Sequence, residues 1–202
     1  MNLSEATPQR PPSPEQLRQL ANFASRVIRS ELGLETPTAR LPEDGEFRAP
    51  GASFVTLRKD GQLRGCIGST VAHRTLVSDV KDNALGAAFR DPRFTPVEVV
   101  ELDMIRLEVS VLSRPSPIAS KHKADLLRQL AVGIDGLTVT CGGRRATYLP
   151  GVWQSFSSRE EFLNSLLAKA RIAGSADFAE LEFERYTTVH SKWCRLDDGS
   201  IK

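Results

Sequence analysis

Residues 53–69, SFVTLRKDGQLRGCIGS, contain two extended runs joined by Asp60-Gly61. Asp-Gly between apolar-rich runs is a strong hairpin signal, because a two-residue turn of this kind needs positive φ angles, which glycine adopts without steric strain. The stretch therefore predicts a β-hairpin. The second strand of this hairpin carries a thiol, Cys66.

The side-chain pattern of the hairpin places Cys66 near a cation. A turn closed on Asp60-Gly61 pairs Lys59 with Gln62, Leu57 with Arg64, and Val55 with Cys66. Because side chains alternate between the two faces of a strand, Arg64 and Cys66 then share one face. A nearby cation favours the thiolate, which is the reactive form of cysteine. Arg64 and Cys66 are therefore candidate catalytic residues, although a bulged three-residue loop would shift the pairing.

Two glycines, Gly65 and Gly68, flank the thiol. Glycine weakens a strand, so its presence beside Cys66 indicates either a bulge or a place where another group approaches the backbone closely. Gly65 and Gly68 are therefore candidate substrate-binding positions. The simpler alternative for Cys66 itself is a small, buried apolar side chain, which is a common environment for cysteine.

A second polar group, at Asn83, Asp91 and Arg93, flanks the ends of the helix expected after the hairpin. These residues could bind a polar substrate, with Arg93 holding a carboxylate or a phosphate. A structural role is the stronger of the two interpretations, because Asp91 would end the helix and pair with Arg93.

A cysteine nucleophile also needs a base, and the chain contains three histidines. His73 follows closely after Cys66 in the sequence and could fold back over it. His122, between two lysines, is expected on the surface, and His190 closes the last expected strand as a sheet-edge residue. The sequence alone therefore supports no catalytic dyad.

Capping signals and helical periodicity predict the helices. Ser13, Pro14 and Gln16 form a helix start with a capping box, and apolar residues then repeat at helical spacing down to Gly33. Further helices are expected at residues 76–88, 124–130 and 158–170.

The expected strands come largely in hairpins. Residues 104–112 alternate between apolar and polar side chains, a second hairpin turns on Gly142-Gly143, and residues 183–190 form a final strand. We predict an α+β fold with a largely antiparallel sheet built from hairpins and packed helices, either as one domain or as a main domain with a small lobe. The expected boundaries are a disordered tail at 1–12, the domain at 13–190 and a C-terminal tail at 191–202.

Composition limits the classes of partner. The formal net charge is +2 and the pI is about 8.5, too small an excess of positive charge to predict binding to nucleic acid or to a membrane. The three cysteines lack Cys-x-x-Cys spacing and no metal or nucleotide motif is present, so we predict neither a metal nor a cofactor. Without a secretory signal or an apolar run of spanning length, the expected location is the cytoplasm.

Several motifs along residues 14–190 resemble those of one family. They are LRGCIG (63–68), NALGAAFRDPRF (83–94), LEVSVLS (107–113), GIDGL (133–137), ATYLPGVW (146–153) and EEFLNSLLAKA (160–170). Through them the chain resembles the AMMECR-one family, whose bacterial members are called AmmeMemoRadiSam system protein A. Residues 71–74 and 170–172 depart from the pattern expected of that family.

The resemblance implies a pathway shared with a Memo-type protein, which resembles non-haem iron dioxygenases, and with a radical-SAM enzyme. It implies no settled activity, so two hypotheses follow. One is an enzyme that acts on a small-molecule substrate through Cys66, with Arg64 as the anion-stabilising group. The alternative is a noncatalytic binding or scaffold module for a partner or substrate, in which the LRGCIG motif shapes a groove.

Overall fold

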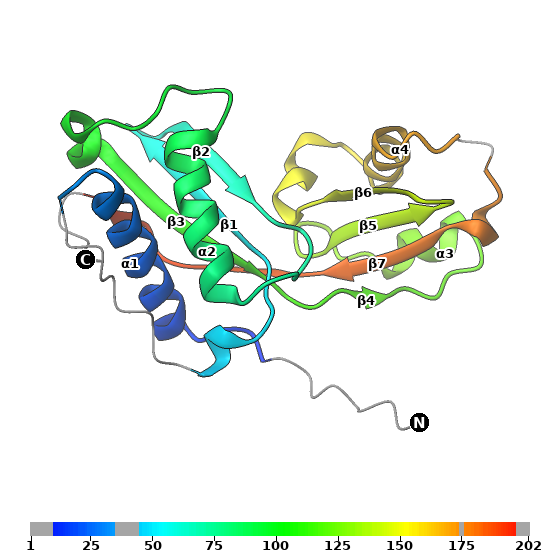
Figure 1. The fold of residues 1–202 in the computed structure, drawn as a ribbon. Helices are drawn as coiled ribbons and strands as arrows, with labels where there is room; N and C mark the ends of the chain where they lie inside the picture. Colours follow the sequence, from blue (N-terminus) through cyan, green and yellow to red (C-terminus); the bar gives the residue numbers. More distant parts are fainter. Residues whose placement is uncertain (1–9, 35–44, 174–175, 197–202) are drawn as a thin grey trace. The chain divides into compact units, whose positions relative to one another are not determined.

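The computed structural model describes residues 10–34, 45–173 and 176–196. The chain divides into two compact units, which are described separately (Figure 1). The first unit comprises residues 1–112 and 189–202, and the second comprises residues 113–188. Both contain an antiparallel sheet with packed helices, so the predicted α+β fold is confirmed. The tail expected at residues 1–12 lies mostly outside the described residues.

The first unit contains a sheet with one face covered by helices (Figure 1). Apolar residues of the two central strands, such as Val55, Leu57 and Leu107, are fully buried on this face and form the core with the helices. The strands follow the order β2-β1-β3-β8, with β9 also paired to β3. The elements are α1 (Pro14–Glu31), β1 (Ser53–Lys59), β2 (Gln62–Gly68), α2 (Leu76–Leu85), β3 (Ile105–Leu112), β8 (Thr188–His190) and β9 (Cys194–Arg195), with short 3-10 helices at Gly45–Arg48 and Val99–Met104.

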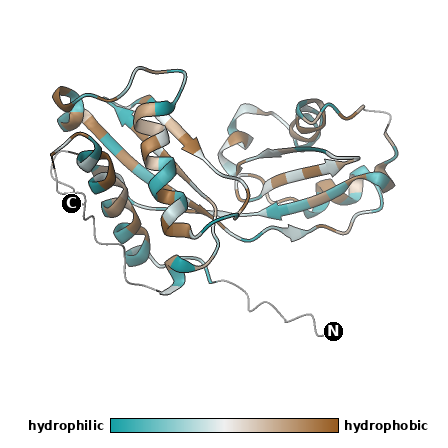
Figure 2. Ribbon diagram, in the orientation of Figure 1, coloured by the Kyte–Doolittle hydropathy of each residue, from teal (hydrophilic) through white to brown (hydrophobic). Residues whose placement is uncertain are grey.

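Helix α1 has the predicted start and end. The Ser13 hydroxyl accepts a hydrogen bond from the Gln16 backbone N–H, and the Gln16 side chain accepts one from the Ser13 N–H, which completes the capping box. Beyond the helix, Gly33 has a φ of 75°. Hydrophobic and hydrophilic residues alternate in bands along the helix (Figure 2), as expected of an element that packs one side on a core.

The first hairpin turns where the sequence predicts, but its register shifts by one residue. Asp60 and Gly61 have φ angles of 49° and 79°, as a primed two-residue turn requires. The pairing of Lys59 with Gln62 is confirmed; further along, a β-bulge makes Arg64 an extra residue. Cys66 therefore lies opposite Thr56 instead of Val55. The prediction that Arg64 and Cys66 share one regular face is wrong, because the bulge interrupts the alternation between them.

We expect Gly61→Val to lower the stability of the first unit clearly, because a β-branched residue is strained at a φ of 79°. Gln62→Thr, at the first residue of β2, is the matched control and should change the melting temperature little. Thermal melts of both variants test this, and equal melting temperatures would contradict the turn geometry.

The second unit has its own sheet, in the order β4-β7-β5-β6, and its own core. The rings of Trp153 and Phe162 stack with centroids 3.6 Å apart inside this core. The second predicted hairpin is confirmed, with positive φ angles at Gly142 and Gly143. The elements are β4 (Ser116–Pro117), α3 (Lys123–Gln129), β5 (Gly136–Cys141), β6 (Arg144–Tyr148), α4 (Arg159–Lys169) and β7 (Glu182–Tyr186), with short 3-10 helices at Pro150–Ser155 and Phe178–Glu180.

The C-terminal part of the chain differs from the prediction in two ways. The single strand expected at residues 183–190 is divided into β7 and β8, which belong to different sheets. Cys194, in the segment 191–202 that was expected to be a tail, is only 1% exposed, and β9 pairs with β3. Residues 197–202 of the expected tail lie outside the described residues.

Candidate functional site

The Cys66 thiol lies on the sheet face opposite the helices, among polar side chains. Its Sγ is 3.5 Å from the Thr56 Oγ1, and the side chain is partly exposed. Cross-strand pairing places Glu108 opposite Thr56, and the next polar position along β3 is Ser110. We call the face that carries Thr56, Cys66, Glu108 and Ser110 the polar face.

The backbone of Cys66 is held by an ion pair at the free edge of β2. The Cys66 N–H donates to Asp91 Oδ2 (2.9 Å), and Arg93 Nη2 donates to the Cys66 carbonyl (3.1 Å). Arg93 also donates to both carboxylate oxygens of Asp91, at 2.9 and 2.7 Å. Since β2 is an edge strand, Asp91 and Arg93 together take the place of a further strand beside Cys66.

Both ends of this ion pair are electrostatically perturbed. The hydrogen bond from Arg93 holds the pKa of the buried Asp91 well below its usual range, with the Cys66 backbone as a further donor. The pKa of Arg93 is raised, mainly by its hydrogen bond to Asp91, with a smaller electrostatic contribution from Cys66. Arg93 is therefore a cation that is bound to the backbone carbonyl of Cys66. The favoured sequence interpretation, in which Asp91 pairs with Arg93, agrees with this geometry.

The two glycines of the motif are explained by close packing. A Cβ at Gly65 would lie 2.1 Å from the carbonyl oxygen of Ala87, in the π-helical segment Gly86–Arg90 that continues α2. A Cβ at Gly68 would lie 2.2 Å from the ring of Phe54. Gly65 and Gly68 thus allow neighbouring groups to approach the backbone, as the sequence indicated, and these groups belong to the protein itself.

Asn83, the remaining candidate substrate-binding residue, is buried in a hydrogen-bond network away from the thiol. Its Nδ2 donates to the Ser53 carbonyl (2.9 Å) and to Asp79 Oδ2 (2.8 Å). Asp79 is fully buried, and sequence reasoning missed it. The available signal was its spacing, since Asp79 lies on the buried helix face together with Leu76 and Asn83.

The Arg64 side chain is directed to Glu101. Arg64 Nη2 lies 2.7 Å from Glu101 Oε1, and Lys59 Nζ lies 3.1 Å from Glu101 Oε2. Burial alone would raise the pKa of Glu101, but hydrogen bonds from Arg64, the Glu98 backbone and Lys59 outweigh burial and lower this pKa to about 2. The expected role of Arg64 as the cation beside Cys66 is corrected accordingly, because the bulged residue is used for this ion pair.

The Glu101 ion pairs predict an acid-dependent loss of stability. Because the pKa of Glu101 is lowered from 4.5 to about 2 on folding, its contribution is fully present above pH 4.5 and is lost as the pH falls toward 2. Denaturant unfolding of the wild type and Glu101→Gln at a series of pH values tests this. The stability difference between the two proteins should shrink between pH 5 and pH 2. A difference that stays constant over this range would show that Glu101 has an ordinary pKa.

The three histidines occupy different surroundings. His73 is exposed, and its Nδ1 lies 2.9 Å from the carbonyl of Val71 in its own loop. His122 is exposed in the second unit. His190 borders the polar face, with its Nδ1 2.8 Å from Ser110 Oγ and 3.6 Å from Glu108 Oε1.

His190 is the histidine that shares a sheet face with the thiol. Interaction with Glu108 raises its pKa, which burial opposes. Glu108 and Ser110 lie on β3, two strands from Cys66, which corresponds to about 10 Å at the usual strand spacing. His190 is therefore placed to contact a molecule that spans the polar face, but not to form a direct dyad with Cys66.

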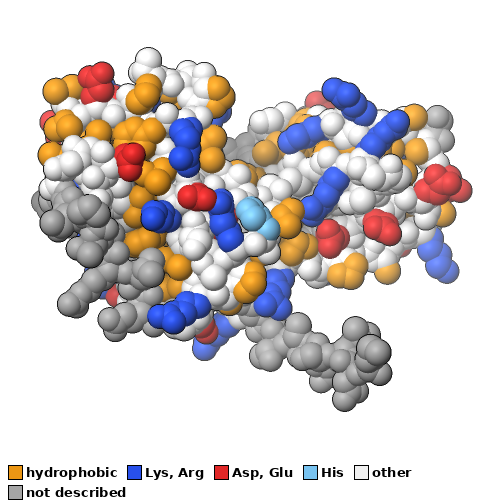
Figure 3. All heavy atoms as spheres, viewed as in Figure 1, with side chains coloured by type: hydrophobic (Ala, Val, Ile, Leu, Met, Phe, Trp, Pro, Cys, Tyr) orange, Lys and Arg blue, Asp and Glu red, His pale blue; other side chains and the backbone are white. Residues whose placement is uncertain are grey.

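Three further features of the structure concern metal-binding groups, membrane-spanning helices and surface charge. The described residues contain no group of three or more His, Cys, Asp and Glu side chains arranged to hold a metal ion. Within the same ranges, each helix is too short or too polar to cross a membrane. On the face shown in Figure 3, Lys and Arg side chains are interspersed with Asp and Glu.

Comparison with known proteins identifies the family. The AMMECR1 family model matches residues 21–191. A protein of Methanothermobacter thermautotrophicus is 40% identical over 163 residues, covering 79% of this chain and 84% of that protein. A protein of Thermotoga maritima is 37% identical over 158 residues, covering 77% and 85%. The crystal structure of uncharacterized protein PH0010 from Pyrococcus horikoshii matches with a TM-score of 0.72 at 30% identity, covering 90% of this chain and 96% of that one. The chain belongs to the AMMECR1 family.

Proposed function

We propose that the protein is an enzyme that acts on a small polar molecule through the thiolate of Cys66. The observation that carries the proposal is the position of Cys66, a partly exposed residue on the polar face whose sulfur lies 3.5 Å from the Thr56 hydroxyl. A purely structural cysteine is more often fully buried among apolar side chains. A reactive cysteine needs access and a nearby cation, and both are present here.

Arg93 takes the anion-stabilising role in this proposal. Its side chain is 53% exposed, and its guanidinium is fixed by Asp91 beside the Cys66 carbonyl. Nε and Nη2 are occupied by Asp91 and the Cys66 carbonyl, so Nη1 is the donor that could bind an oxygen of a substrate carboxylate or phosphate. Arg64 has a structural role in this proposal, because its ion pair with Glu101 fixes the bulged part of β2.

The rest of the polar face supplies groups that suit a polar substrate. Glu108, Ser110 and His190 form a connected cluster on β3 and β8. The imidazole of His190 is half exposed and anchored through Nδ1, which is the usual arrangement of a histidine that exchanges protons. A substrate that reaches both Cys66 and this cluster would span about 10 Å, the width of two strand spacings.

A noncatalytic binding or scaffold module is the second candidate. The observation that favours it is that Gly65, Asp91 and Asn83 each have a structural partner within the protein. In this case the motif shapes a rigid sheet edge, and Cys66 contributes a side chain of suitable size.

We also propose that the protein works in the cytoplasm and that it takes part in a pathway with Memo-type and radical-SAM proteins, a pathway that the resemblance of its motifs implies. Inspection of the genomic neighbourhood tests this association. Genes for both partners should lie near the gene for this chain in several genomes, and their consistent absence would contradict the pathway role.

Limited iodoacetamide labelling at neutral pH is expected to modify Cys66 before Cys194, because Cys194 is buried and Cys66 is partly exposed. Peptide mass mapping reads out the order, and Cys141, which is also partly exposed, is the internal reference. Arg93→Ala should slow the labelling of Cys66 several-fold, and Arg93→Lys, which keeps the charge, should slow it less. Labelling confined to Cys141 in the folded protein would support the binding module.

Complementation separates the two candidates more directly. Metabolites of a deletion strain would be profiled after expression of the wild type, Cys66→Ser or the control Cys141→Ser. If the enzyme uses the thiolate, Cys66→Ser should fail to restore the wild-type metabolite profile. Cys141→Ser should restore it. Full restoration by a folded Cys66→Ser protein would reject the thiol mechanism.

A further inference from the structure

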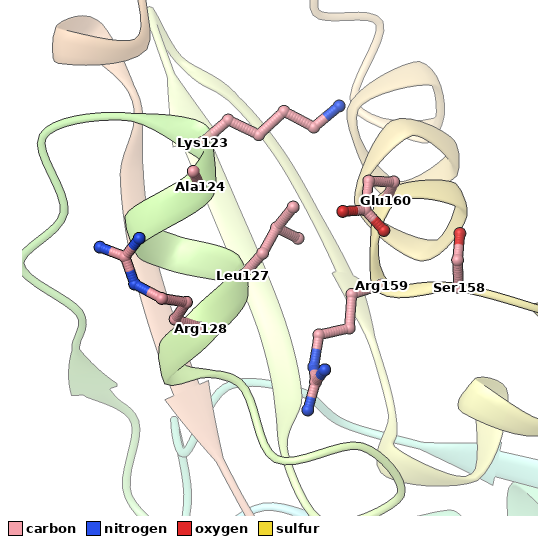
Figure 4. A pocket seen from close by; sticks show the side chains of 7 residues that line it. All are labelled: Lys123, Ala124, Leu127, Arg128, Ser158, Arg159 and Glu160. Carbon is pink, nitrogen blue, oxygen red and sulfur yellow. The ribbon is translucent and has the colours of Figure 1, made fainter.

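A hollow of about 700 Å³ lies between α3 and the start of α4 in the second unit (Figure 4). Its volume falls in the range of small-molecule sites and is much larger than a single phosphate ion needs. Ala124 and Leu127 of α3 give it an apolar part, and charged side chains of both helices surround that part. We propose that this hollow binds a small organic molecule that carries two anionic groups, either phosphates or carboxylates.

The charge of the lining supports an anionic ligand. Lys123 Nζ donates to the Asn164 side-chain oxygen (2.9 Å), and Arg159 Nε donates to the Leu130 carbonyl (3.3 Å). Both acceptors are uncharged, so these hydrogen bonds fix the two cations without neutralising them. Arg128, in contrast, forms an ion pair with Asp125. An ammonium and a guanidinium held in place by neutral oxygens attract anions and form strong, charge-assisted hydrogen bonds with them.

The arrangement in Figure 4 suggests two separate acidic groups on the ligand. Lys123 extends from α3 and Arg159 from the start of α4, with Leu127 between them. One acidic group would bind each cation, and the connecting part would lie over Leu127. Glu160 is the carboxylate in the lining, and its negative charge disfavours an acidic group close to it. The proposal uses no residue of the Cys66 site and holds whether or not Cys66 is catalytic.

Propane-1,3-diyl bisphosphate, in which a short carbon chain joins two phosphates, is the probe for this site. It would be titrated into the isotope-labelled full chain at constant ionic strength and followed by the amide signals of the NMR spectrum. We expect saturable shifts concentrated at residues 123–128 and 158–160, and weaker binding of inorganic phosphate. Lys123→Gln and Arg159→Gln should each raise the dissociation constant about fivefold or more, which is the effect of losing one charge-assisted hydrogen bond.

Lys121→Gln is the matched control, because it removes the same charge at an exposed position that does not line the hollow. It should change the dissociation constant less than about twofold. Equal weakening by Lys121→Gln and Lys123→Gln, or shifts spread evenly over the chain, would overturn the proposal in favour of general ionic attraction. Equal affinity for inorganic phosphate and the bisphosphate would overturn the assignment to a ligand with two anionic groups. If Arg159→Gln does not fold, Arg159→Lys decides, since it should retain most of the affinity.

Discussion

Gly65→Ala is expected to destabilise the first unit by about 3 kcal/mol or more, which is the upper range for forcing an extra methyl group into packed surroundings. The added Cβ would lie 2.1 Å from the carbonyl oxygen of Ala87. Backbone atoms on both sides of this contact cannot rotate away as a flexible side chain could. The variant must therefore separate β2 from the segment Gly86–Arg90, which also carries the chain to Asp91.

Gly45→Ala is the matched control for this prediction. Gly45 lies in the same unit, and a Cβ there would meet nothing within 4 Å. Denaturant unfolding of both variants, followed by circular dichroism, measures the difference. If Gly65→Ala were as stable as Gly45→Ala, the close contact between β2 and the Ala87 carbonyl could not exist. Labelling of Cys66 in Gly65→Ala should also change, because the same movement displaces the thiol.

This contact explains why the hairpin register could be predicted only in part. The positive φ angles at Asp60 and Gly61 depend on the turn residues alone, and the sequence signals them directly. The bulge at Arg64 lies next to a tertiary contact between Gly65 and Ala87, which is more than twenty residues later in the chain. Gly65 therefore indicated a close approach without showing which group approaches or how the register shifts.

Tertiary contacts also decide which arginine lies near Cys66. Period-two alternation selected Arg64, because it is the nearest arginine in the strand. The structure instead brings Arg93 to Cys66 through Asp91, and it directs Arg64 to Glu101. Both arginines were recognised as candidates in the sequence. Their roles depend on which carboxylate each one meets, and that is decided by the fold.

The sequence pattern also did not predict that the final strand is divided between two sheets. Residues 183–190 are rich in aromatic and β-branched side chains and contain no glycine or proline, so nothing local marks a boundary at Thr187. The pairing partners decide the outcome: β7 pairs with β5 in the second unit, and β8 joins the sheet of the first. Periodicity predicts that a strand forms but not which sheet it joins.

Asp79 was missed because an acidic residue in the first turn of a helix has an ordinary explanation, the favourable interaction with the helix dipole. In the structure its side chain is fully buried and accepts five hydrogen bonds. The donors are the Ser53 backbone N–H and hydroxyl, the Ser69 hydroxyl, Arg74 Nε and Asn83 Nδ2, at 2.7 to 2.9 Å. Asp79 thus joins the start of β1, the end of the hairpin and α2 at one point.

Asp79→Ala is expected to lower the free energy of unfolding by about 4 kcal/mol, the usual effect of removing one partner from a buried charged network. The loss arises because the buried donors of Ser53 and Asn83 remain inside the protein without their acceptor. Asp82→Ala is the control, since Asp82 also pairs with Arg74 but its side chain is 51% exposed. That variant should change stability by less than about 1 kcal/mol. Denaturant unfolding compares the two, and similar stabilities would mean that Asp79 is solvated and does not organise the first strand of the Cys66 hairpin.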